Sequence, residues 1–385
     1  MICIINCEHY VIIPLIVCNK NDIRVMELIK YIVVVIISLV SAVLIASCAM
    51  YSDIREYNQS SHYADGVFNN DPSPAPTTTT TFGFIQRYVF EAKVDAKPIQ
   101  PIPLKPISYQ DILNVADDTP AIYRLGHSSL LLKIAGKIIL IDPMFSQRAS
   151  PVSFFGPKRF HPVPLNIEDF AEIDAVIISH DHYDHLDKET IKKLTTKTKQ
   201  FFVPLGVGQY LTGWGVASSK VNELDWWQSD NLDEIKFTAT PAQHFSGRGL
   251  SDRNKTLWAS WVITTPRHNI FYSGDGGYFD GFKKIGEALG PFNLAILESG
   301  AYDKNWSSVH MMPKQTIQAH KDLNADVLLP VHNSTFDLAF HSWYDPLTQL
   351  TVLAQQHDIK LATPVIGEQY LLDGDVPNQR WWEHN

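Results

Sequence analysis

Cysteine is missing from most of the 385-residue chain, because its four cysteines are Cys3, Cys7, Cys18 and Cys48. Residues 49–385 can form no disulfide among themselves, and a metal site there must use histidine, aspartate or glutamate. Lysine and arginine (32) are outnumbered by aspartate and glutamate (41), so the formal net charge is −9, and no long basic run occurs. That balance disfavours a protein built to bind a polyanion, so we expect no nucleic-acid partner.

Long hydrophobic runs are confined to the amino terminus. Lys30 precedes an apolar run that ends at Ser47, and the small residues before Cys48 are typical of a secretory signal. The ending "IASC" matches a bacterial lipoprotein signal, in which Cys48 would be lipidated; an uncleaved membrane anchor is the alternative. We therefore predict that residues 1–47 are an upstream extension, with Met26 as the true start, plus a signal peptide. The protein would be lipid-anchored in the cell envelope, facing the periplasm or exterior.

The next segment is polar. "NNDPSPAPTTTTT" at residues 69–81 is too poor in apolar residues to fold by itself. Residues 48–94 are predicted to be a disordered Pro/Thr-rich tether, and residues 95–385 a globular domain.

The globular part alternates strand and helix patterns, which favours an α/β fold with mixed sheets. "SLLLKIAGKIILIDP" (129–143) predicts a hairpin. Helices are predicted after Asp187, a plausible N-cap, and at "FDGFKKIGEALG" and "PKQTIQAHKDL". Further strands are expected at 173–179, 200–204, 235–241, 258–265, 269–274, 293–298 and 326–331.

One loop concentrates the chemistry. "ISHDHYDHLD" (178–187) follows an apolar strand, so its polar side chains emerge where that strand ends. His180 and His182 can point the same way from an extended backbone and serve one ion, while Asp184 and His185 serve another. Neither pair completes a zinc shell, so further ligands must come from other strand ends.

Three residues meet that requirement. His244, Asp275 and His332 each follow a predicted strand, and glycines flank Asp275. His244 would complete the first site and His332 the second, with Asp275 bridging both. The alternative is that the three are ordinary buried polar groups.

The order H-x-H-x-D-H, His, Asp, His resembles the metallo-β-lactamase superfamily of binuclear hydrolases, which implies a four-layer αββα sandwich. "RLGHSSLLLKIAGKIILIDPMFSQRASP", "FGPKRF", "LWASWV", "YSGDGGYFDGFKKIGEALGPFNLAILESGAY" and "VHNSTF" resemble its N-acyl-phosphatidylethanolamine-hydrolysing phospholipase D branch. That resemblance implies two Zn²⁺, although iron or manganese also suit such ligands. It implies that Tyr183 and His310 bind the lipid phosphate, and that His310 and Asp184 are catalytic.

The expected function is a membrane-tethered phosphodiesterase that uses a metal-bound hydroxide to cleave N-acyl-phosphatidylethanolamine-like lipids to phosphatidic acid and N-acylethanolamine. The expected partners are the phospholipid, a membrane surface reached through the lipid anchor, and a second copy in a homodimer. Animal members have a polar residue before the phosphate-binding histidine, where this chain has Val309. Alternatives are another hydrolase of this fold, acting on a lactone, sugar phosphate or other phosphodiester, or a non-catalytic zinc-binding envelope lipoprotein.

Some residues receive plainer interpretations. His127 is expected to support a ligand or to pack, His310 is alternatively structural, and His320 is expected at the surface. Trp226 and Trp227 are expected at an exposed edge, whereas Trp258 and Trp261 are expected in the core. Phe154 and Phe155 could line an acyl groove or contact a membrane. Lys158 and Arg159 are expected to be solvated.

Overall fold

The computed structural model describes residues 57–73, 87, 91 and 93–384. The predicted signal peptide and Cys48 lie outside the described residues. No helix in the described part of the chain is long and apolar enough to cross a bilayer.

The predicted strands and helices are present within a residue or two of the expected bounds, and several further elements accompany them. The helices are α3 (Tyr109–Leu113), η1 (Ile167–Asp169), α4 (Lys188–Leu194), α5 (Gly208–Gly213), η2 (Ser218–Lys220), α6 (Gly281–Leu289), α7 (Pro313–Asp322), α8 (Asp345–Gln356) and η3 (Trp381–His384). The strands are β1 (Tyr63–Ala64), β2 (Val67–Phe68), β3 (Ala121–Gly126), β4 (Ser129–Ile134), β5 (Lys137–Ile141), β6 (Ile173–Ile177), β7 (Thr198–Pro204), β8 (Val221–Leu224), β9 (Ser229–Leu232), β10 (Ile235–Thr240), β11 (Ser260–Thr264), β12 (Asn269–Tyr272), β13 (Phe292–Glu298), β14 (Ala325–Val331), β15 (Lys360–Leu361) and β16 (Gln369–Leu371).

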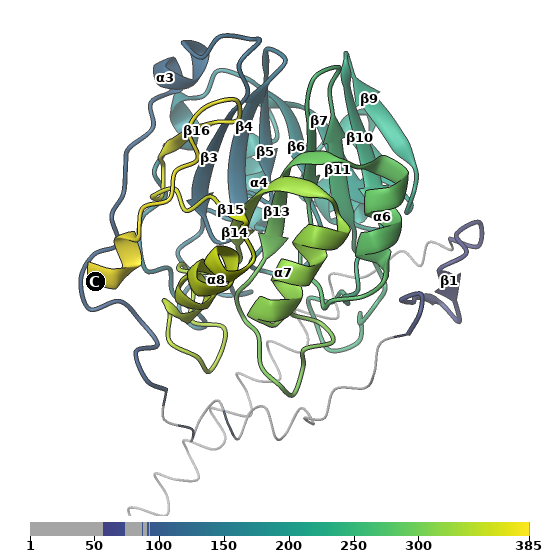
Figure 1. Cartoon of the computed structure of the whole chain (residues 1–385). Helices are drawn as coiled ribbons and strands as arrows, with labels where there is room; N and C mark the ends of the chain where they lie inside the picture. Colours follow the sequence, from purple (N-terminus) through teal and green to yellow (C-terminus); the bar gives the residue numbers. More distant parts are fainter. Residues whose placement is uncertain (1–56, 74–86, 88–90, 92, 385) are drawn as a thin grey trace, which may run out of the picture. The chain divides into compact units, whose positions relative to one another are not determined.

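The described strands other than β1 and β2 form two seven-stranded mixed sheets (Figure 1). One has the order β16-β3-β4-β5-β6-β7-β8, and the other β15-β14-β13-β12-β11-β10-β9. In the first sheet, β5 to β8 are parallel neighbours, and in the second β12 to β15 are. Consequently the carboxyl ends of several strands meet at shared edges, where polar loops can gather.

Alternating side chains sort the core into layers. Leu130 and Leu132 of β4 pack in one apolar cluster with Phe237 and Trp261 of the other sheet, while Leu131 points to the opposite face. On that outer face the cluster includes buried residues of α3, α4 and α5. Residues of α6, α7 and α8 cover the outer face of the second sheet, as Figure 1 shows. This confirms the predicted four-layer αββα architecture.

Residues 57–73 differ from the predicted disordered tether. They contain the β1–β2 hairpin, and Phe68 is fully buried in the core between the sheets. The backbone N–H of Phe68 donates to the carbonyl of Asn254, and Lys255 donates to the carbonyl of Gly66. A short apolar anchor and main-chain bonds therefore dock a segment that its overall composition marked as unfolded.

Several side-chain predictions need correction. Trp226 is buried and donates to the carbonyl of Trp258, so only Trp227 of the pair is exposed. His320 is buried on the inner face of α7, because the helix turns that position toward the sheet. Arg159 is buried rather than solvated, and its guanidinium donates to backbone carbonyls. The expected burial of Trp258 and Trp261 is confirmed.

Candidate metal centre

The seven predicted ligands converge where strands of both sheets end. The loop 178–187 leaves β6, and His244, Asp275 and His332 follow β10, β12 and β14. Asp187 caps α4 as predicted, and its carboxylate also accepts the backbone N–H of Ser146. The cap fixes the far end of the loop and so limits where its side chains can lie.

His180, His182 and His244 form the first cluster. Nδ1 of His182 lies 2.8 Å from Nε2 of His180 and 3.2 Å from Nε2 of His244. Burial first, and then the neighbouring imidazoles, hold the pKa of His180 and of His244 well below the usual range. These rings are therefore neutral near pH 7, the form that binds a metal ion.

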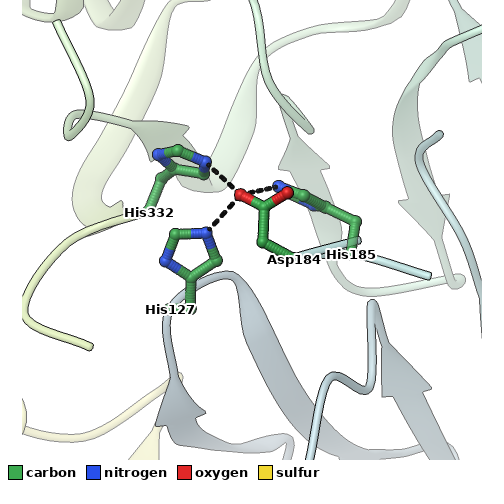
Figure 2. A group of neighbouring side chains, drawn as sticks. All are labelled: His127, Asp184, His185 and His332. Carbon is green, nitrogen blue, oxygen red and sulfur yellow. Dashed lines mark hydrogen bonds and ion pairs between the residues drawn. The ribbon is translucent and has the colours of Figure 1, made fainter. Parts of the chain in front are cut away.

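Asp184, His185 and His332 form the second cluster, and His127 joins it (Figure 2). Oδ2 of Asp184 lies 2.9 Å from Nε2 of His127, 3.2 Å from Nε2 of His332 and 3.8 Å from Nε2 of His185. The structure thus places His127 directly against a predicted ligand, in line with its expected supporting role. Its pKa is lowered to about 3, first by burial and then by the nearby His332.

Asp275 lies between the two clusters. Its Oδ2 is 2.8 Å from Nε2 of His332, 3.1 Å from Nε2 of His185 and 3.9 Å from Nε2 of His180. Gly274, with φ +59°, makes this approach feasible, since a Cβ there would lie 2.8 Å from Cβ of Ser179 and 3.0 Å from the carbonyl of Ala259. The bridging position predicted for Asp275 agrees with this placement.

The electrostatics of the second cluster favour a cation. Burial alone would lower the pKa of His332, but Asp275 and Asp184 outweigh it and raise the pKa to about 10. Burial opposes the charge of Asp184 and Asp275 in the same way, yet His185 and its neighbours hold both carboxyl pKa values well below the usual range. The buried Asp275 and the partly buried Asp184 therefore draw positive charge to this point, which a metal ion can supply in place of protons.

The donor set itself fits metal ions. Oδ1 of Asp275 is buried without a hydrogen-bond partner in the described part of the chain, and Nε2 of His185, although 3.1 Å from Oδ2 of Asp275, makes no hydrogen bond of good geometry there. Buried polar atoms are rarely left unpaired, and three imidazole nitrogens facing one another at 2.8–3.2 Å would repel if all presented lone pairs. A cation between these atoms removes both difficulties.

Strained backbone surrounds the centre. His127, Asp142 and His332 have φ of +53°, +39° and +63°, although none is glycine. The N–H of His332 donates to the carbonyl of His127, and the N–H of His127 donates to Thr335. Such conformations typically cost about 1–3 kcal/mol each and persist where surrounding contacts impose them, commonly at functional sites.

Asp142, at the end of β5, is a site residue that the sequence reasoning missed. Its carboxylate accepts the backbone N–H of Ser179 at 2.7 Å and the hydroxyl of Tyr272 at 2.5 Å. Its Oδ2 also lies 2.7 Å from Nδ1 of His185, so Nε2 of that ring is directed at Asp275. The signal available in the sequence was the position itself, an acid directly after a buried strand.

Glu298, at the end of β13, is a second site residue that the sequence reasoning missed, and it too is an acid at the end of a buried strand. It is fully buried, and burial raises its pKa. Its Oε1 lies 3.0 Å from Nδ1 of His310, and its Oε2 accepts the backbone N–H of Met311 at 3.0 Å. The His310 ring lies next to those of His244 and His332, at centroid distances of 5.3 and 5.2 Å. The structure thus brings His310 to the metal centre.

The remaining loop residues have defined contacts. Tyr183 is half-buried, its hydroxyl donates to the carbonyl of Arg248, and the guanidinium of Arg248 lies 4.0 Å from its ring centroid. Asp181, for which the sequence suggested no role, accepts the N–H of Gly247 and the hydroxyl of Thr256. Asp181 therefore ties the loop after β6 to the loop after β10.

The chain is similar in sequence and in fold to several known proteins. A family model described as "Beta-lactamase superfamily domain" matches residues 137–333. The chain is 38% identical over 250 residues to N-acyl-phosphatidylethanolamine-hydrolyzing phospholipase D 1 of Caenorhabditis elegans, covering 61% of this chain and 70% of that protein. It is 36% identical over 241 residues to the mitochondrial enzyme of that name in Saccharomyces cerevisiae, covering 60% and 51%. Among solved structures, an isothiocyanate hydrolase from Delia radicum gut bacteria superposes with a TM-score of 0.52 at 21% identity, covering 65% and 98%.

The family model spans more than half of the chain, and the nematode relative exceeds 30% identity over two thirds of its own length. The chain therefore belongs to the β-lactamase superfamily, within its N-acyl-phosphatidylethanolamine-hydrolysing phospholipase D-like branch. Membership identifies a hydrolase of a metal-dependent family, and the clustered histidines and aspartates are a candidate site for its metal. The isothiocyanate hydrolase shares the fold alone at this identity.

Proposed function

We propose that the protein is a membrane-tethered, binuclear zinc phosphodiesterase of the phospholipase D type, acting on N-acyl-phosphatidylethanolamine-like lipids. One observation carries the proposal: two clusters of metal-binding side chains that share Asp275, in a chain related to two enzymes named for this reaction. Neither the substrate nor the metal follows from the fold, which hosts many hydrolases.

Two ions would be held by His180, His182 and His244 on one side and by Asp184, His185 and His332 on the other, with Asp275 between them. Paired divalent ions at such a site supply a nucleophile near neutral pH and stabilise charge on phosphoryl oxygens. The chain contributes the orientation of one ligand, because Asp142 faces Nδ1 of His185 and turns Nε2 of that ring toward the site.

We propose that His310 donates a hydrogen bond to the phosphate and acts as the general acid. Hydrolysis breaks the bond between phosphorus and the ethanolamine oxygen, water supplies the new oxygen on phosphorus, and the leaving alkoxide takes a proton. In its imidazolium form His310 donates from Nδ1 to the carboxylate of Glu298, and Nε2–H can then donate to a phosphate oxygen or pass its proton to the leaving oxygen. Tyr183 is the second proposed phosphate contact, and to donate there its hydroxyl must leave the carbonyl of Arg248.

An exposed aromatic loop supports work at a lipid surface. Phe154 and Phe155 are each 74% exposed, and the exposed Lys158 follows three positions later in the chain. Aromatic side chains with a basic neighbour suit the boundary between lipid headgroups and acyl chains. We propose that this loop and a lipidated Cys48 hold the protein at the envelope membrane. Mass spectrometry of the mature protein tests the anchor, since an amino terminus other than a diacylated Cys48 contradicts it.

A substrate comparison tests the activity. Purified, zinc-loaded protein is incubated with N-acyl-phosphatidylethanolamine, plain phosphatidylethanolamine and bis-p-nitrophenyl phosphate. Release of N-acylethanolamine and phosphatidic acid from the first supports the proposal. Turnover of lactones alone, or none of any phosphodiester by a zinc-loaded protein, refutes it.

A further inference from the structure

We infer that the amino-terminal hairpin segment, residues 57–73, positions a metal-binding side chain: Asn70 fixes His244 and thereby the ion of the first cluster. The inference rests on the metal centre of the proposed function. It does not depend on the substrate, because its test measures metal binding.

Asn70 pairs with both main-chain groups of His244. Its Nδ2 donates to the carbonyl of His244 at 2.7 Å, and its Oδ1 accepts the N–H of His244 at 3.1 Å. One planar amide therefore satisfies the donor and the acceptor of a single residue, which fixes the orientation of that residue's backbone. The two residues are 174 positions apart, so only the docked hairpin segment brings them together.

The same amide connects His244 to the core. Oδ1 of Asn70 also accepts Nε1–H of Trp258 at 3.1 Å, and Trp258 is 1% exposed. That indole donates to the carbonyl of Ala242 at 2.9 Å as well. His244 lies between β10 and β11, outside either strand. Asn70 and Trp258 thus hold this part of the loop after β10 in place.

The His244 side chain is aimed by a separate contact. Its Nδ1 lies 3.0 Å from the carbonyl of Val309, which leaves Nε2 directed at Nδ1 of His182, 3.2 Å away. A tilt of the His244 backbone would move Nε2 away from the cluster, because the ring pivots on its Cα. Partners that orient metal ligands in this way typically contribute about 10- to 100-fold in metal affinity or activity.

The neighbouring residue provides a matched control. Asn69 is exposed, and among the residues that the structure describes its side-chain amide donates only to the carbonyl of Val67. Asn69→Ala therefore changes the same segment by the same number of atoms without touching His244.

The experiment uses the full chain loaded with zinc and titrated with a competing chelator, following release of each ion. Asn70→Ala is expected to lower the affinity for one of the two ions by about 10- to 100-fold and to leave the affinity for the other unchanged. Asn69→Ala is expected to match the wild type. Asn70→Asp is expected to show the same selective loss, because it keeps an acceptor for the N–H of His244 but faces its carbonyl with a second oxygen.

Asn70→Asp also serves if Asn70→Ala does not fold. Equal weakening of both ions, or unchanged affinity for both, overturns the inference. A failure of the phospholipase assay would leave this result intact, so the two proposals fail separately.

Discussion

Replacing Asp142 with asparagine should detach His185 from the metal centre while leaving the fold in place. The carboxylate accepts from Ser179 and Tyr272 and faces Nδ1 of His185 at 2.7 Å. In the variant, the amide oxygen can keep the N–H of Ser179, and the amide nitrogen then faces His185. Because that nitrogen donates, His185 must place its own hydrogen on Nε2, the atom directed at Asp275.

The magnitude follows from that tautomer change. A protonated Nε2 cannot bind an ion, so we expect the affinity for the second ion to fall by about 10- to 100-fold. That is about 1.4–2.7 kcal/mol, comparable to the loss of one hydrogen bond to a charged group. Zinc content after dialysis against graded chelator measures it. Asp326→Asn, which removes an exposed ion pair with Lys360, is the control. Full retention of both ions in Asp142→Asn would refute this account of His185.

Three further results are expected. Glu298→Ala should slow cleavage of the lipid by up to about 100-fold and cleavage of a p-nitrophenyl ester far less, because nitrophenolate leaves without a proton. Glu298→Gln, whose amide still reaches His310, should restore part of the lost activity. Equal losses on both substrates would contradict a general acid. Burial, and then Arg159, lower the pKa of His161 to about 3, so its contribution to stability is present above its unfolded pKa of about 6.5 and is lost as the pH falls toward 3. His161→Gln should therefore flatten the acid decline in the free energy of unfolding by up to about 1.4 kcal/mol per pH unit, whereas His357→Gln at the surface should not. Phe237→Ala should cost about 3–5 kcal/mol of unfolding free energy in a denaturant titration, since this buried ring packs 4.4 Å, centroid to centroid, from Phe202 of the facing sheet, and a loss below 1 kcal/mol would contradict that packing.

The sequence predicted the elements that depend on local pattern. Two short apolar runs separated by a turn in "SLLLKIAGKIILIDP" predicted β4 and β5, and the order of histidines and aspartates predicted which side chains gather at the strand ends. The structure brings the seven predicted ligands together, while their roles in binding metal remain predictions. Pattern is enough here because burial on two faces restricts both spacing and orientation.

Contacts between distant segments could not be predicted in this way. Asp142 and Glu298 are single acids whose partners lie 43 and 12 positions further along the chain. Residues 57–73 look disordered by composition, yet one buried phenylalanine and a few main-chain bonds dock them. Trp226 likewise depends on tertiary packing, because flanking charges suggested exposure and an indole bond to a core carbonyl prevents it.

The docked hairpin segment also shortens the stretch of chain that would link the domain to a lipidated Cys48. Had residues 48–94 all been free, the domain could have ranged far from its lipid. Because Tyr57 already begins the docked segment, only nine peptide links separate it from Cys48. At about 3.3–3.6 Å per residue, a lipidated Cys48 would keep that corner of the domain within about 30 Å of the headgroups. Since Asn70 of the same segment contacts His244, a short linker from Cys48 would keep the first metal cluster near the bilayer surface, where a phospholipid presents its phosphate.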